Sequence, residues 1–196
     1  MANIKAELIQ IMNTALELEH AARIQYLAHA ELIQGINAEP IVERLKEIAS
    51  DEQKHEGIFR ELIGNYLGGE PSMGLAETHP AKETTKILKV NLKDEKAAID
   101  FYKQIYEKVN EYKKELPYAY ETLEHEIRHI IIDEQEHVTE LALLLAKCWA
   151  FWFLEKGTGG IMKTIEIISK EELKKKIDQK KEDVQISATN ENRELP

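Results

Sequence analysis

The chain has 196 residues, of which 43% are hydrophobic and 32% charged, and its formal net charge is −10. This length allows one domain with a sizeable core, and the many Ala, Leu, Ile, Glu and Lys residues favour helix. The negative charge argues against nucleic-acid binding over the whole surface and favours attraction of cations. Cys148 is the sole cysteine, which excludes an intramolecular disulfide and a C-x-x-C metal site.

No segment reads as a membrane or export signal. The N-terminal stretch is amphipathic, without the uninterrupted apolar run of a signal peptide. The most apolar run, Leu141 to Leu154, is interrupted by Lys147 and is too short to span a bilayer. We therefore expect a cytoplasmic protein that does not associate with membranes.

Four long helices are predicted, each of roughly 30 to 40 residues. The first stops at Gly35, a common C-terminal cap, and the second starts near Pro40, which suits a first turn. Their expected bounds, in chain order, are about Asn3–Gln34, Pro40–Gly69, Lys82–Lys114 and Pro117–Lys156.

The connections predict an all-α bundle of two antiparallel hairpins. The first and last connections are short, whereas residues 68–81, with three Gly and two Pro, form a longer crossover between the hairpins. Residues 1–156 are expected to form this bundle. Residues 157–196 are predicted to be an extension with a strand over 164–168, a short helix opened by the capping box Ser169/Glu172, and a disordered polar tail from about 182.

A five-residue motif, D-E-Q-x-H, occurs at 51–55 and again at 133–137. The copies fall on the second helix of each predicted hairpin. Each contains Glu-x-x-His, which places a carboxylate and an imidazole one turn apart on one helix face. A single such pair is common on a solvated face, so one copy alone would carry little weight.

The core-facing positions of the helices, read in alternating steps of four and three, strengthen the signal. They are mostly apolar or aromatic, yet each of the four rows contains one glutamate, and two rows add a histidine at the next position. No Lys or Arg lies on these rows to compensate the buried charge, and two metal ions are the natural counter-charge. The predicted ligands are Glu19, Glu52, His55, Glu95, Glu134 and His137.

These residues resemble the ferritin-like di-iron carboxylate superfamily over about residues 3–155, particularly bacterioferritins, with Dps-like and rubrerythrin-like proteins as relatives. The resemblance implies a ferritin-like four-helix bundle in which Glu52 and Glu134 bridge two irons. Glu19 with His55 and Glu95 with His137 would then be the terminal ligands. It further implies that Asp51 and Asp133 orient the ligand histidines.

The sequence differs from each of these related families at particular positions. Bacterioferritins carry a haem-ligand Met where this chain has Gln53, so haem is not expected. Rubrerythrins have a four-cysteine iron site and an additional glutamate at the position of Ala98. Dps proteins share their sites between subunits, whereas this chain holds a complete set.

The resemblance implies a ferroxidase that oxidises Fe(II) with O2 or H2O2 for storage or detoxification, as a homo-oligomer that is either a dimer or a cage. Three alternatives remain: a rubrerythrin-like peroxidase or oxidase, a dimanganese catalase, and an iron-sequestering bundle without turnover. Iron and manganese both accept Glu and His, so ligand type does not separate them.

Several further side chains have two readings each. Tyr26, seven residues after Glu19, either donates a hydrogen bond or an electron at the metals, or is an aromatic core residue; Tyr102 is similar. His29 is expected to be a hydrogen-bonded core residue rather than an accessory ligand. The remaining expectations are a surface position for His20, His125 and His129, and burial for Cys148.

Overall fold

Within residues 2–35 and 38–155, which the computed structural model describes, the chain forms an all-helical bundle with four α-helices and no strand. The helices are α1 (Ala2–Ala30), α2 (Ala38–Glu61), α3 (Thr84–Glu111) and α4 (Tyr120–Glu155). The predicted strand, helix and tail after residue 156 lie outside the described residues, and the predicted domain boundary stays a prediction. None of the described helices is long and apolar enough to cross a membrane.

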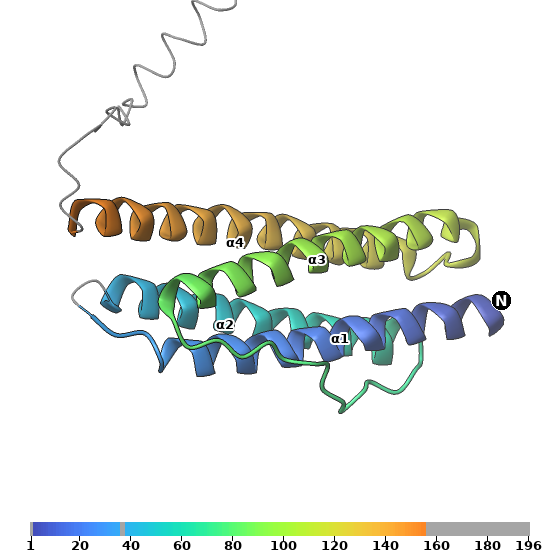
Figure 1. Cartoon of the computed structure of the whole chain (residues 1–196). Helices are drawn as coiled ribbons and strands as arrows, with labels where there is room; N and C mark the ends of the chain where they lie inside the picture. Colours follow the sequence, from blue (N-terminus) through green and yellow to red (C-terminus); the bar gives the residue numbers. More distant parts are fainter. Residues whose placement is uncertain (1, 36–37, 156–196) are drawn as a thin grey trace, which may run out of the picture. The chain divides into compact units, whose positions relative to one another are not determined.

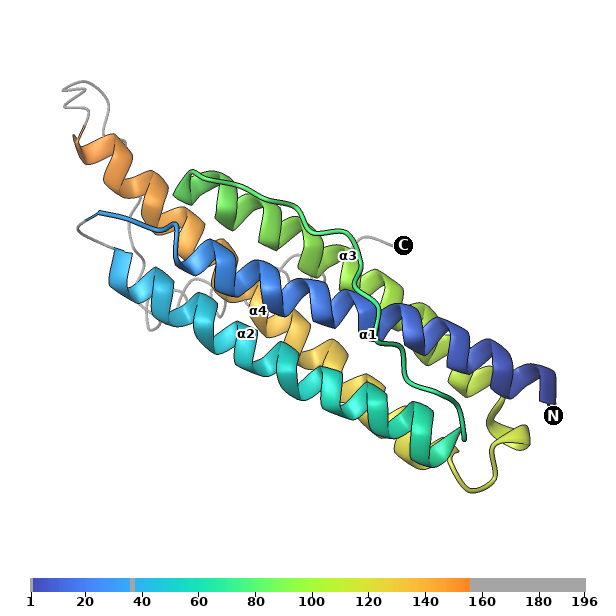
Figure 2. The ribbon, with the colours of Figure 1, turned by 90° about the horizontal axis from the view of Figure 1, so that it is seen from below.

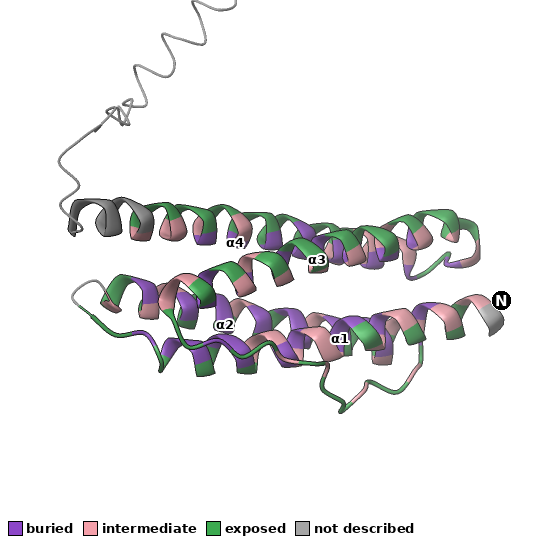
Figure 3. Cartoon of the chain, in the orientation of Figure 1, coloured by how far each residue is buried: buried purple, intermediate pink, exposed green. Residues whose placement is uncertain are grey.

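The helices form two antiparallel hairpins, as predicted (Figure 1). α1 packs against α2 and α3 against α4, and the hairpins meet through α1 on α3 and α2 on α4. The buried residues face one another between the helices, while the outer faces are exposed (Figure 3). Because most core-facing positions read from the sequence are buried, each glutamate in those rows is carried into the interior.

The helix ends differ from the predicted bounds by a few residues. α1 stops at Ala30 rather than Gln34, because the chain tightens into turns in which Leu32 N–H donates to His29 O (3.0 Å). α4 begins at Tyr120 rather than Pro117, after a 3-10 turn over Lys113–Glu115. Such fraying into tighter turns is common at helix ends.

The second helix ends in a π-helical turn, Leu62–Tyr66, where Leu67 N–H donates to Leu62 O (3.1 Å). Gly68 then takes a φ of 71°, a left-handed conformation that glycine adopts without steric cost. At Gly69 a Cβ would lie 2.8 Å from the side chain of Ile9, so the chain passes close against α1.

The crossover then runs along α1 to the start of α3 (Figure 2). It is tied to α1 at both ends. At one end Ser72 Oγ donates to Glu17 (2.5 Å), and Ala76 N–H donates to the Glu17 carbonyl (3.1 Å). At the other end Ala81 N–H donates to His29 Nε2 (3.2 Å). The crossover is therefore an ordered strap over one face of the bundle.

Candidate metal centre

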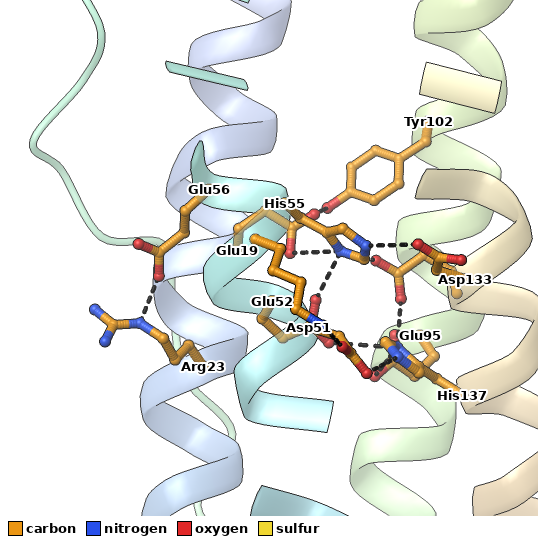
Figure 4. A network of polar contacts seen from close by, with 12 residues as sticks. Glu19, Arg23, Asp51, Glu52, His55, Glu56, Glu95, Tyr102, Asp133 and His137 are labelled. Carbon is orange, nitrogen blue, oxygen red and sulfur yellow. Dashed lines mark hydrogen bonds and ion pairs between the residues drawn. The ribbon is translucent and has the colours of Figure 1, made fainter. Parts of the chain in front are cut away.

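The six predicted ligands converge in the middle of the bundle, and all are at least 95% buried. α1 contributes Glu19 and α3 contributes Glu95. The two copies of the motif contribute the other four residues, two from α2 and two from α4 (Figure 4). The helical period of 3.6 residues explains this convergence, because each Glu-x-x-His pair lies on the same face as the surrounding apolar residues.

Their ligand atoms form two overlapping groups, within each of which all atoms lie within 4.8 Å of one another. One group contains Glu19 and His55, the other contains Glu95 and His137, and both contain Glu52 and Glu134. This is the geometry of two neighbouring cation positions that share two carboxylates.

The two histidines present the same nitrogen to the cluster. His55 Nδ1 lies 3.1 Å from Glu52 and 3.2 Å from Glu134, and His137 Nδ1 lies 3.1 Å from Glu134. The other nitrogen, Nε2, faces an aspartate in each case. Nδ1 is therefore the nitrogen placed to bind a metal.

The aspartates reach across the hairpins. Asp133 on α4 lies 3.4 Å from Nε2 of His55 on α2, and Asp51 on α2 lies 3.6 Å from Nε2 of His137 on α4. A carboxylate at Nε2 fixes the ring orientation and makes the opposite nitrogen a better ligand. Each copy of the motif thus positions the histidine of the other copy.

Two buried tyrosines hold the terminal glutamates in the same crossed manner. Tyr26 on α1 donates to Glu95 on α3, and Tyr102 on α3 donates to Glu19 on α1 (2.6 Å). Each tyrosine follows the glutamate of its own helix by seven residues but bonds to the glutamate of the facing helix. The sequence allowed the same two roles for both tyrosines, and in the structure both are buried and donate a hydrogen bond to a glutamate of the cluster.

Electrostatics favour protonation of three of the four clustered glutamates in the metal-free chain. Burial, together with the neighbouring carboxylates, raises the pKa of Glu52 and Glu95 well above the usual range, and burial also raises the pKa of Glu134. Burial opposes ionisation of Glu19 as well, but hydrogen bonds with His55, Glu52 and Tyr102 outweigh it and hold the pKa of this carboxyl below its ordinary value.

The residues fit a pair of metal ions. Glu52 Oε1 is buried and has no hydrogen-bond partner among the described residues. A bound cation would satisfy this oxygen and offset the repulsion among the four carboxylates. Carboxylate oxygen and imidazole nitrogen together suit iron, manganese and zinc.

A cavity of about 340 Å³ connects the cluster with the α1–α3 face. Its inner end is lined by the four glutamates and both tyrosines, and small residues of α1 and α3 form its walls. Its outer end is lined by Glu77 and His79 of the crossover and by Asp94 of α3. The acidic residues at both ends make it a suitable path for cations.

The sequence reading missed a polar network beside this cavity. Asn91, buried one turn before Glu95, accepts hydrogen bonds from Gln25 (2.9 Å) and His29 Nδ1 (3.2 Å), and Gln25 also accepts from His79 N–H (2.5 Å). His29 is thus a hydrogen-bonded core residue that anchors the crossover. The spacing of Asn91 four residues before Glu95 was the available signal.

Two other expectations need correction, and one is confirmed. His20 is partly buried, with 13% of its side chain exposed, and its Nδ1 lies 2.7 Å from Gly74 O and its Nε2 2.7 Å from Arg60. Cys148 is partly buried rather than fully buried, and it packs against the apolar core cluster that contains Leu141. His125 and His129 are exposed on α4, as predicted.

A buried ion pair beside the cluster was also not foreseen. Glu56, one residue after His55, is 2% exposed and lies 2.5 Å from Arg23 (Figure 4). It also lies 2.7 Å from Arg60. These arginines compensate Glu56, which points away from the six ligands.

An all-helical bundle of two hairpins with a buried cluster of four glutamates and two histidines is the arrangement of the helical bundles that carry carboxylate-type dinuclear sites. The sequence profile of the ferritin-like domain matches residues 9–148. The chain therefore belongs to the ferritin-like domain family.

Individual relatives agree with this assignment. A bacterial ferritin from Pseudomonas aeruginosa is 31% identical over 91 residues, which are 46% of this chain and only 58% of the relative. A ferritin-like, diiron-carboxylate protein from Bacillus anthracis superposes with a TM-score of 0.68 and 27% identity, covering 74% of this chain and 99% of the other. A dodecameric thioferritin from Bacteroides fragilis shares the fold, with a TM-score of 0.66, 23% identity, and coverage of 75% and 89%.

Proposed function

We propose that the chain is a ferroxidase that binds two iron ions through the six clustered residues and oxidises Fe(II) with O2 or H2O2. The observation that carries this proposal is the sharing of Glu52 and Glu134 by both ligand groups. Two ferrous ions held side by side supply two electrons to an oxidant, and hard carboxylate oxygens stabilise the ferric product.

The chain's own residues prepare the centre for this chemistry. Asp51 and Asp133 hold the histidines with Nδ1 toward the metals, and Tyr26 and Tyr102 hold the terminal glutamates by hydrogen bonds. The raised pKa values of Glu52, Glu95 and Glu134 favour their protonated forms in the metal-free chain, so cation binding must displace protons from them. The cavity under the crossover is the proposed path for Fe(II).

We further propose that the oxidised iron is stored or detoxified by a homo-oligomer. Support comes from the fold shared with a dodecameric thioferritin, which is an analogy at the level of fold. A closed assembly requires symmetric contacts between identical subunits.

The test is aerobic loading of the untagged chain with Fe(II), followed by size-exclusion chromatography with mass and iron determined on the same peak. Fe(II) oxidation with many irons per chain on a large closed oligomer is the expected result. About two irons per chain on a small oligomer would contradict iron storage and would indicate instead an oxidoreductase that uses the same site. No oxidation above the rate in buffer would contradict the ferroxidase proposal itself.

A further inference from the structure

A second group of potential metal ligands lies on the outer face of α4. His125 and His129 are four residues apart in the sequence His-Glu-Ile-Arg-His, and both are exposed. Their ring centroids are 4.3 Å apart, with an angle of 53° between the ring planes. This spacing is the one by which two histidines on a helix bind zinc together.

The surroundings leave both imidazoles available. Among the described residues, neither ring has a hydrogen-bond or ion-pair partner. The neighbouring cation, Arg128, is engaged by Glu124 at 3.0 Å, and Glu124 also accepts from Tyr106 (2.9 Å).

Two exposed carboxylates extend the row at the same four-residue spacing. Glu121 precedes His125 by one turn, and Asp133 follows His129 by one turn. Residues four apart are neighbours on a helix surface, so both acids add negative potential close to the rings. Asp133 is 52% exposed even though it also contacts His55.

We propose that His125 and His129 form a surface site for a divalent transition cation of borderline softness, Zn²⁺ or Cu²⁺. Two nitrogens that bind one such ion at about 2.1 Å lie on the order of 3 to 3.5 Å apart. Rings with centroids 4.3 Å apart reach that separation by small side-chain rotations. Water completes the coordination, and hard cations such as Mg²⁺ are disfavoured by imidazole.

This site is independent of the buried centre. On α4, Glu134 and His137 are buried, whereas the two histidines of the pair are exposed, and neither of them belongs to the six clustered ligands. The proposal therefore stands or fails separately from the ferroxidase proposal.

Immobilised Cu²⁺ distinguishes the two sites, because a matrix-bound ion cannot reach the buried histidines. The untagged full chain is applied to a Cu²⁺–iminodiacetate column and eluted with imidazole. His125→Ala and His129→Ala should each bind about tenfold more weakly and elute much earlier, because each removes one half of a two-point attachment. In solution, titration with Zn²⁺ should show one site fewer per chain in both variants.

His79→Ala is the matched control, because His79 has a half-exposed side chain outside the pair. Its elution should equal that of the unmodified chain. The proposal is overturned if either single variant of the pair elutes with the unmodified chain, or if His79→Ala shifts as far as they do. Both pair variants should keep the unmodified rate of Fe(II) oxidation, and loss of that rate would overturn the stated independence.

Discussion

At the residue scale, the centre is held by contacts that cross between the hairpins. The aspartate of each motif copy faces the histidine of the other copy, and each tyrosine bonds to the glutamate of the facing helix. The two halves of the site therefore depend on each other. A change in one half should be felt at both cation positions.

The shared carboxylate Glu52 gives the sharpest prediction at this scale. Glu52→Ala and His137→Ala should each lower the rate of Fe(II) oxidation by about 100-fold or more, because ligands of one centre act as a unit. Circular dichroism should still report a helical fold, since removing Glu52 also removes repulsion from the metal-free core. Full activity in both variants would contradict the site, and His125→Ala, which alters only the exposed face, serves as the unaffected control.

The tyrosines provide a second prediction. Tyr26→Phe and Tyr102→Phe should each destabilise the metal-free fold by about 0.5–1.5 kcal/mol, because each removes one buried hydrogen bond. Urea denaturation would measure the effect. The crossed geometry predicts similar effects on oxidation rate in stopped-flow measurements. A large loss in Tyr26→Phe with none in Tyr102→Phe would instead assign Tyr26 an electron-transfer role of its own.

At the element scale, the crossover both connects the two hairpins and lines the proposed path of cations to the centre. It is tied to α1 by Glu17, Gln25 and His29, and its residues Glu77 and His79 line the outer end of the cavity. A segment that is rich in Gly and Pro thereby becomes an ordered wall of the path to the centre.

Charge reversal in the crossover tests this path. Glu77→Lys should slow the loading of Co²⁺, which reports entry without oxidation, by about tenfold, because a positive charge at the outer end repels cations. The final number of ions bound per chain should not change. Glu70→Lys makes the same change on an exposed crossover residue that does not line the cavity, and its loading rate should stay near that of the unmodified chain. Equal slowing in both variants would indicate a general charge effect and contradict the path.

The helices and the convergence of the six candidate ligands could be predicted because both follow from helical periodicity. The glutamates lie in rows of apolar core-facing positions, so the same period that buries the apolar residues also buries the glutamates. In each Glu-x-x-His pair, this period places the histidine on the same helix face as its glutamate. The crossed contacts of Asp51 and Asp133 could not be assigned from spacing, since they depend on how one hairpin lies on the other. The Asn91 network and the π turn at Leu62–Tyr66 were missed because the network joins three separate segments of the chain and the π turn has no residue pattern of its own.

At the scale of the whole molecule, the buried charges couple stability to pH. In the metal-free chain the raised pKa values of Glu52, Glu95 and Glu134 mean that the folded state binds more protons than the unfolded state. Their stabilising contribution is full below the unfolded pKa of about 4.3 and is lost as pH rises through the folded values. The pKa of His55 is also raised, so its stabilising contribution likewise decreases as the pH rises above about 6.5.

The free energy of unfolding of the metal-free chain should therefore fall between about pH 5 and about pH 8. Glu19, with its lowered pKa, acts in the opposite sense, but its window lies below about pH 4.3. Denaturation in urea with a chelator present, repeated at several pH values, would measure the trend. Metal affinity should rise over the same range, since the ligands must lose protons. Increasing stability of the metal-free chain with pH would show that the carboxyls are ionised in the fold.

The central claim is that one chain holds two metal ions that share Glu52 and Glu134. Anomalous diffraction at the iron edge, from crystals of the chain loaded with Fe(II), tests it most directly. We predict two peaks about 3.5–4 Å apart. One should lie beside Glu19 and His55 and the other beside Glu95 and His137. A single peak, or iron bound only elsewhere on the chain, would contradict the claim.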